Sequence, residues 1–166
     1  MDASAAARIL FFEVAKAEED HLTPAEFELP DSIAGIFKVV ASYYLEASML
    51  LALQNAARNN EELTETLGEF EKLIVFGLDE ADRAKYTAHI TEAIEELRLL
   101  FSDEHSDWRE SGFARRWLAR VGVVRFLTPA QPGPFSSLRL TSYWMNMPLI
   151  MHRTIQHLVG LGSVEE

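Results

Sequence analysis

One segment of the sequence, IAGIFKVVASYYLEASMLLAL at residues 33–53, is apolar at almost every position. Three of its polar residues, Lys38, Ser42 and Glu46, are spaced four residues apart. At about 100° per residue they form a single polar line, which covers an arc of about 80° on a helix. We therefore expect a central helix over residues 31–58 with other helices packed on most of its sides. Glu46 should lie near solvent or near Lys38.

A membrane-spanning helix is the alternative interpretation of this segment. At a rise of about 1.5 Å per residue it is long enough to cross a bilayer core. However, Lys38 and Glu46 lie well inside it, and each costs about 2.5 to 3.5 kcal/mol near mid-membrane. No cluster of basic residues flanks the segment to set an orientation. We therefore expect a buried helix in a protein without a transmembrane segment.

Apolar residues recur at steps of three and four in several further segments, which predicts more amphipathic helices. Pro148 lies inside the last of these segments and predicts a kink near Trp144, because its ring clashes with the carbonyl four residues earlier. The sequence thus predicts a single all-α domain, residues 1–166, built as a bundle of five or six helices. The predicted N-caps are Asp31, Asn59 or Asn60, Asp79, Asp107, and Ser136 or Ser137.

Composition excludes several classes of site. The chain of 166 residues has no cysteine, so it has no disulfide, no thiolate nucleophile and no cysteine-ligated metal site.

Residues 1–4 include an acidic residue and no lysine or arginine, unlike the start of a secretory signal. We expect a cytoplasmic location. A net charge of -11 also argues against general nucleic-acid binding, which depends on neutralising phosphates.

Charge is distributed unevenly along the chain. Residues 1–108 hold 8 Lys and Arg and 23 Asp and Glu, a net charge of -15. Residues 109–166 hold 7 Lys and Arg and 3 Asp and Glu, a net charge of +4, and the two parts add up to -11. Complementary charge steers association between proteins. We therefore expect a non-enzymatic, regulatory protein that binds another macromolecule, a basic protein surface, through acidic helices at residues 61–72 and 79–96. Glu65 and Glu69 are among the expected contacts.

Three arginines could form a second contact. Arg109, Arg116 and Arg120 fall within about 40° on the predicted fifth helix. Guanidinium groups in a row suit carboxylates or phosphates, which they bind with paired hydrogen bonds. Two interpretations stay open: the arginines pair internally with the acidic third or fourth helix, or they face an anionic ligand or partner.

Signatures of common enzymes are absent from the sequence, including G-x-S-x-G, the P-loop, G-x-G-x-x-G and H-E-x-x-H. His89, Glu92 and Glu96 lie within about 60° on the predicted fourth helix and are the alternative for a metal site in a helical bundle. A solvated acidic face explains the same residues. We therefore predict no metal and no cofactor.

An apolar pocket between the central and last helices is the remaining alternative. Its candidate lining residues are Tyr43, Tyr44, Trp144, Met147 and Met151, with Pro148 opening space beside them. Aromatic and methionine side chains at helical spacing also commonly pack against one another in the core of a protein. A closed core here would favour the interaction protein. A cavity of about 300 Å³ or more with converging polar groups would favour a small-molecule- or metal-binding protein, an enzyme included. The sequence leaves the oligomeric state open, a homo-oligomer included.

Overall fold

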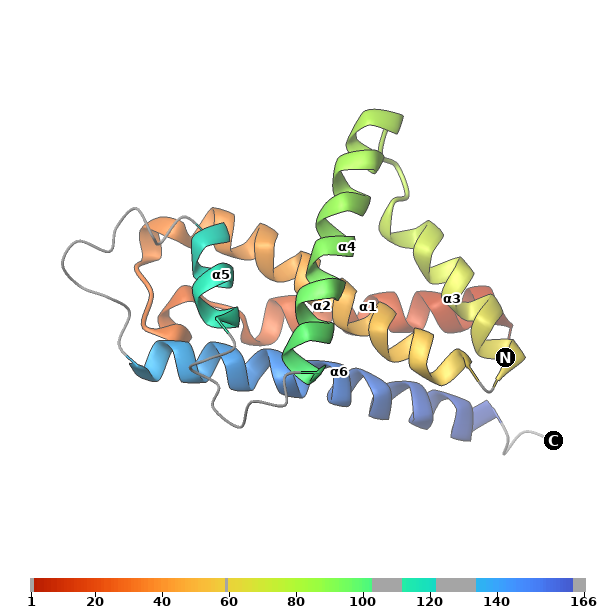
Figure 1. The fold of residues 1–166 in the computed structure, drawn as a ribbon. Coiled ribbons are helices and arrows are strands. Elements are labelled where there is room, and N and C mark those ends of the chain that lie inside the picture. Colours follow the sequence, from red (N-terminus) through yellow and green to blue (C-terminus); the bar gives the residue numbers. More distant parts are fainter. Residues whose placement is uncertain (1, 59, 103–111, 122–133, 163–166) are drawn as a thin grey trace.

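The computed structural model of the protein describes residues 2–58, 60–102, 112–121 and 134–162 (Figure 1). Within these ranges the chain forms six α-helices and no strand. The helices are α1 (Ala3–His21), α2 (Ala34–Ala57), α3 (Glu61–Ile74), α4 (Glu80–Ser102), α5 (Phe113–Arg120) and α6 (Pro134–Gly162). Two short 3-10 helices, η1 (Pro24–Phe27) and η2 (Asp31–Ile33), connect α1 to α2. The predicted all-α bundle is confirmed.

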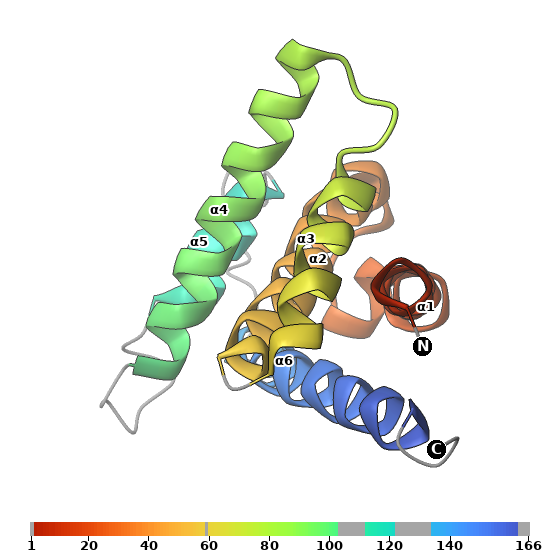
Figure 2. The same cartoon turned by 90° about the vertical axis from the view of Figure 1, so that its right-hand side faces the viewer.

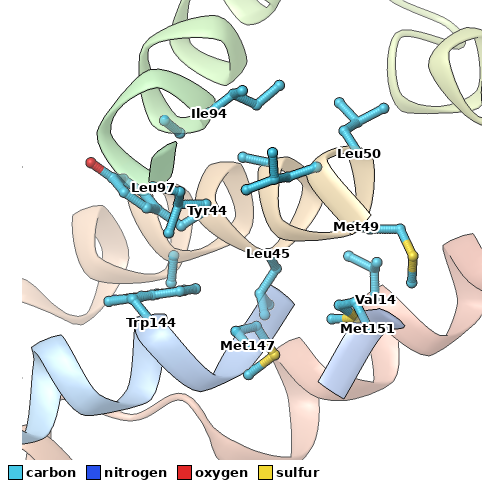
Figure 3. Close-up of a cluster of buried hydrophobic side chains, with 14 of the residues drawn as sticks. Val14, Tyr44, Leu45, Met49, Leu50, Ile94, Leu97, Trp144, Met147 and Met151 are labelled. Atoms are coloured by element: carbon cyan, nitrogen blue, oxygen red, sulfur yellow. The ribbon is translucent and has the colours of Figure 1, made fainter. Parts of the chain in front are cut away.

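Helix α2 lies at the centre of the bundle, as its apolar sequence predicts. It packs against α1, α3, α4 and α6, and Figure 2 shows α4 on one side of it and α1 on the other. Phe37, Leu45 and Leu53 of α2 are fully buried. Figure 3 shows Ile94 of α4 and Met147 of α6 reaching α2 from opposite sides. Burial of each such side chain stabilises the fold by about 1.5 to 3 kcal/mol.

The span Asp31–Ala57 is long and apolar enough to cross a membrane by length and composition. In the structure, 72% of its most apolar window is buried inside the protein. The core helix of a soluble protein combines the same length, composition and burial. Length and composition are therefore weak support for a membrane span here, and the absence of a transmembrane segment stays a prediction.

Helices α2 and α6 begin at other residues than the predicted caps. The chain forms the 3-10 helix η2 from Asp31, so that α2 begins only at Ala34. Helix α6 begins at Pro134, before the predicted serine caps, because proline fits the first turn of a helix, where its missing N–H has no helical partner. Pro148 lies inside α6, and the kink there stays a prediction. The predicted cap Asp107 of the fifth helix lies outside the described residues.

Helices α3 and α4 begin at the predicted caps. The Asn60 side chain accepts a hydrogen bond from the N–H of Glu62 at 3.0 Å, and the Asp79 side chain accepts one from the N–H of Asp82 at 2.9 Å. The two helices run in opposite directions, and the N-terminal end of α4 extends beyond the other helices (Figures 1 and 2). The connection between α3 and α4 therefore lies at a projecting end of the molecule.

Candidate functional site

Glu46 is a buried carboxyl group where α2 meets α4. The residue is 6% exposed, and the Tyr86 hydroxyl of α4 donates a hydrogen bond to its Oε2 atom at 2.6 Å. Burial raises the pKa of Glu46 to about 7, the Tyr86 hydrogen bond opposes this change, and the charge of Glu18 adds to it. The prediction that Glu46 lies near solvent or near Lys38 is wrong, because α4 covers this part of α2.

Tyr43 also contacts α4. Its ring stacks on His89, with ring centroids 5.0 Å apart and an interplanar angle of 16°, and it meets Tyr86 edge-on at 5.1 Å. Burial raises the pKa of Tyr43, and the negative charge of Glu46 raises it further. Consecutive residues on a helix point about 100° apart. Tyr43 therefore meets α4 at Tyr86 and His89, while the ring of Tyr44 contacts the rings of the core.

Arg120 joins α5 to α4 and α2. Its guanidinium donates hydrogen bonds to Glu92 Oε2 at 3.0 Å and to Glu96 Oε1 at 2.8 Å. The Tyr44 hydroxyl donates to the other oxygen of Glu96. The Arg120 guanidinium carbon also lies 5.9 Å from the centre of the Tyr44 ring. Burial, with the hydrogen bond to Glu96 as the second cause, raises the pKa of Tyr44. The Glu96 carboxylate of α4 thus accepts hydrogen bonds from side chains of both α2 and α5.

The three arginines of the predicted stripe have different surroundings. Arg120 pairs internally with α4, as one of the two open interpretations has it. Arg116 is exposed on α5, and its charge lies close enough to Tyr44 to lower the pKa of that hydroxyl in part. Arg109 lies outside the described residues. A contact of Arg109 or Arg116 with a partner stays a prediction.

Replacing Arg120 with methionine should lower the free energy of unfolding by about 1 to 3 kcal/mol, because Glu96 would remain largely buried without its charged donor. Methionine retains most of the aliphatic contacts of the arginine stem. The matched control is Arg115→Met at an exposed position of the same helix, which should change stability by no more than about 0.5 kcal/mol. Urea denaturation measures both. Equal stability of the Arg120 variant and the wild type would show that these hydrogen bonds do not hold α5 in place.

Most side chains of the predicted pocket are packed core residues. Tyr44 and Trp144 are fully buried, and Met147 and Met151 are 5% and 3% exposed. The rings of Tyr44 and Trp144 lie 5.3 Å apart, and both methionines project from α6 toward the other helices (Figure 3). The core is closed at these four side chains, whereas a groove further along α2 and α6 has a volume of about 510 Å³, above the threshold of about 300 Å³. The interaction protein and the small-molecule-binding protein therefore both stay predictions.

The alternative metal ligands have other contacts in the structure. His89 stacks on Tyr43, and Glu92 and Glu96 both accept hydrogen bonds from Arg120. Among the described residues, no group of three or more histidine, aspartate or glutamate side chains could hold a metal ion. A metal bound at Glu92 and Glu96 would have to displace the guanidinium that already neutralises them.

Exposed acidic side chains are concentrated on α3 and α4. Six of them lack an ion-pair partner among the described residues, and we call them the acidic surface: Glu61, Glu62, Glu65, Glu71, Glu80 and Glu95. Glu69, also predicted as a contact, pairs with Lys72 of its own helix at 2.6 Å. Phe76, in the connection between α3 and α4, is 85% exposed. The projecting end of the molecule thus combines the solvated carboxylates of Glu71 and Glu80 with an exposed aromatic ring.

A groove of about 510 Å³ lies where α2, α4 and α6 meet. It lies further along α2 and α6 than Tyr44 and Trp144, and its lining includes Arg98 of α4 and Leu149 of α6. Sequence reasoning named Pro148, which does line the groove, and missed the rest of the lining. The sequence carried one partial signal: Arg98 directly follows Leu97, a residue of the apolar stripe of this helix.

Comparison with known proteins assigns no family to the chain. No family profile matches the sequence, and the searches found no curated protein and no solved structure that resembles it.

Proposed function

We propose that the protein is a non-enzymatic binding protein, whose acidic surface on α3 and α4 contacts a basic surface of another protein. The observation that carries this proposal is that these carboxylates remain solvated. Residues 109–166 carry a net charge of +4, and the ion pairs between the described residues of this part and α4 are those of Arg120. Arg139 of α6 pairs with Glu28, before α2.

Solvated carboxylates on α3 and α4, two helices that follow each other in the chain, produce a negative potential that extends into solvent. Such a potential raises the rate of encounter with a positively charged partner and disfavours acidic ones. The effect weakens as salt screens the charges, over about 8 Å at physiological ionic strength. Binding through the acidic surface should therefore depend strongly on salt.

Phe76 supplies an apolar contact at the projecting end of the molecule, close in sequence to Glu71 and Glu80 of the acidic surface. It is the most exposed of the large apolar side chains described, and Gly77 follows it with a φ of 81°, a conformation that glycine adopts without strain. Buried aromatic side chains dominate the affinity of many protein interfaces, whereas charges at the rim set rate and specificity. The proposed partner therefore offers an apolar pocket for Phe76 with lysine or arginine residues around it.

The experiment is affinity capture from a lysate of the cells that make the protein, with mass spectrometry of what is retained. The test variant changes Glu65, Glu71 and Glu95 to glutamine, which removes three charges from the acidic surface. The control variant removes three exposed charges elsewhere: Glu19→Gln, Glu26→Gln and Asp31→Asn.

The test variant should bind the retained partner about tenfold more weakly than the wild type, since each exposed charge pair contributes about 0.2 to 1 kcal/mol. The control variant should bind like the wild type, and Phe76→Ser should lose most of the affinity. Equal retention by both triple variants, or retention that is insensitive to salt, would overturn the proposal.

A further inference from the structure

The groove between α2, α4 and α6 has an apolar floor. Leu51 and Ala52 of α2 lie on it, with Phe101 of α4 and Pro148 and Leu149 of α6. Its volume of about 510 Å³ is in the range of small-molecule sites, which lie between about 300 and 1,000 Å³. Phe101 is 43% exposed and Leu149 is 55% exposed, so the floor is open to solvent along part of its length.

Polar groups gather toward one end of this groove. Helices α2 and α6 run in the same direction along each other (Figure 1). On α2 the lining changes from Leu51 to Arg58, and on α6 it changes from Leu149 to His152. Both helices therefore place their polar lining residues at the same end, and the apolar lining residues precede them. The groove is amphipathic along its length.

The charge of the lining is positive in a protein whose net charge is -11. Arg58 and Arg98 line the groove, and no acidic side chain is among its described lining residues. Arg98 donates one hydrogen bond to Gln54 at 2.8 Å, and neither arginine has an ion-pair partner in the described part of the chain. Guanidinium groups bind carboxylates with paired hydrogen bonds.

From this juxtaposition we infer that the groove binds a small amphiphile, a single alkyl chain that ends in a carboxylate. The alkyl chain lies on the floor formed by Leu51, Ala52 and Leu149. The carboxylate lies toward Arg58, and the second guanidinium is that of Arg98, which contacts α2 at Gln54, one turn before Arg58. This site is separate from the acidic surface, so it can be tested independently of the proposed function.

Isothermal titration calorimetry with three probes of equal chain length tests the inference: decanoate, decanol and decyltrimethylammonium, each below its aggregation concentration. Decanoate should bind at one site per chain and about tenfold more tightly than decanol, and the cation should bind most weakly. In the series octanoate, decanoate and dodecanoate, each added methylene should increase affinity about fourfold, as expected for burial of the chain.

Variants locate the site. The double variant Arg58→Gln and Arg98→Gln should lose the preference for decanoate over decanol, and Leu149→Asp should weaken decanoate binding at least tenfold. The matched control is Arg153→Gln, an exposed arginine of α6 that does not line the groove. It should bind decanoate like the wild type. If the double variant does not fold, the comparison of Leu149→Asp with Arg153→Gln decides.

Three results would overturn the inference. The first is no saturable binding of decanoate to the wild type. The second is equal affinity for all three probes, which would indicate an apolar surface without anion recognition. The third is unchanged decanoate binding by Leu149→Asp, which would place the alkyl chain elsewhere on the protein.

Discussion

Replacing Trp144 with alanine should lower the free energy of unfolding by about 3 to 5 kcal/mol. Trp144 is fully buried, and its ring lies 4.9 Å from that of Tyr143 and 5.3 Å from that of Tyr44. Alanine would leave a cavity between α2, α5 and α6 that the surrounding rings cannot fill. Guanidinium chloride denaturation, followed by circular dichroism, measures the loss.

The control for this substitution is Phe12→Ala, at an aromatic residue of α1 that is 71% exposed. It should change stability by no more than about 0.5 kcal/mol. Trp144→Phe should cost clearly less than Trp144→Ala. It retains a ring, and it removes an indole N–H that is buried without a hydrogen-bond partner among the described residues. Such an unpaired group costs about 1 to 3 kcal/mol. Equal losses for both Trp144 variants would contradict this view of the core.

Replacing Glu46 with glutamine should stabilise the protein at about pH 8 by up to about 3 kcal/mol. Burial raises the pKa of Glu46 from 4.5 to about 7 in the folded protein, and this difference corresponds to about 3 kcal/mol. Because the folded-state pKa of Glu46 is higher than the unfolded-state pKa, the wild-type protein has its full stability with respect to this group below about pH 4.5, where Glu46 is protonated. The wild-type protein loses this contribution as the pH rises through about 7 and the buried carboxyl group ionises, whereas the glutamine variant does not. Glutamine stays neutral and can still accept the hydrogen bond from Tyr86.

Chemical denaturation of both proteins at about pH 4 and at about pH 8 measures this effect. The difference between Glu46→Gln and the wild type should be small at the lower pH and large at the higher one. Glu95→Gln, at an exposed position of α4, is the control and should show no such change with pH. A difference between Glu46→Gln and the wild type that is the same at both pH values would mean that Glu46 ionises as a solvated carboxyl group does.

The polar line on α2 shows what a sequence pattern can predict. Because all but one narrow arc of the segment is apolar, its central and buried position followed from periodicity alone. The position of Glu46 did not follow, since the pattern of one helix does not indicate where a neighbouring helix crosses it. Tyr86 carried a usable signal: it belongs to the apolar stripe of α4, and a buried hydroxyl needs a partner. That partner lies on α2, 40 residues away.

The contacts of Arg120 and the lining of the groove could not be predicted from the sequence for the same reason. Angular positions on the fifth helix placed Arg120 beside other arginines, but only the packing of α5 against α4 brings it to Glu92 and Glu96. The groove combines residues of three helices that are far apart in sequence. Pro148 indicated open space next to α2, whereas Arg98 could not be assigned to that space before the crossing of α4 and α2 was known.

Zero-length cross-linking tests the proposed function most directly. A carbodiimide couples carboxylates to lysine amines that they contact, so the complex with the captured partner reports which acidic residues of this protein lie in the interface. We expect cross-links from the acidic surface, in particular Glu65, Glu71 and Glu95, to lysines of the partner, and their loss at high salt. Cross-links confined to acidic residues elsewhere, such as Glu19 and Glu26, would contradict binding through α3 and α4.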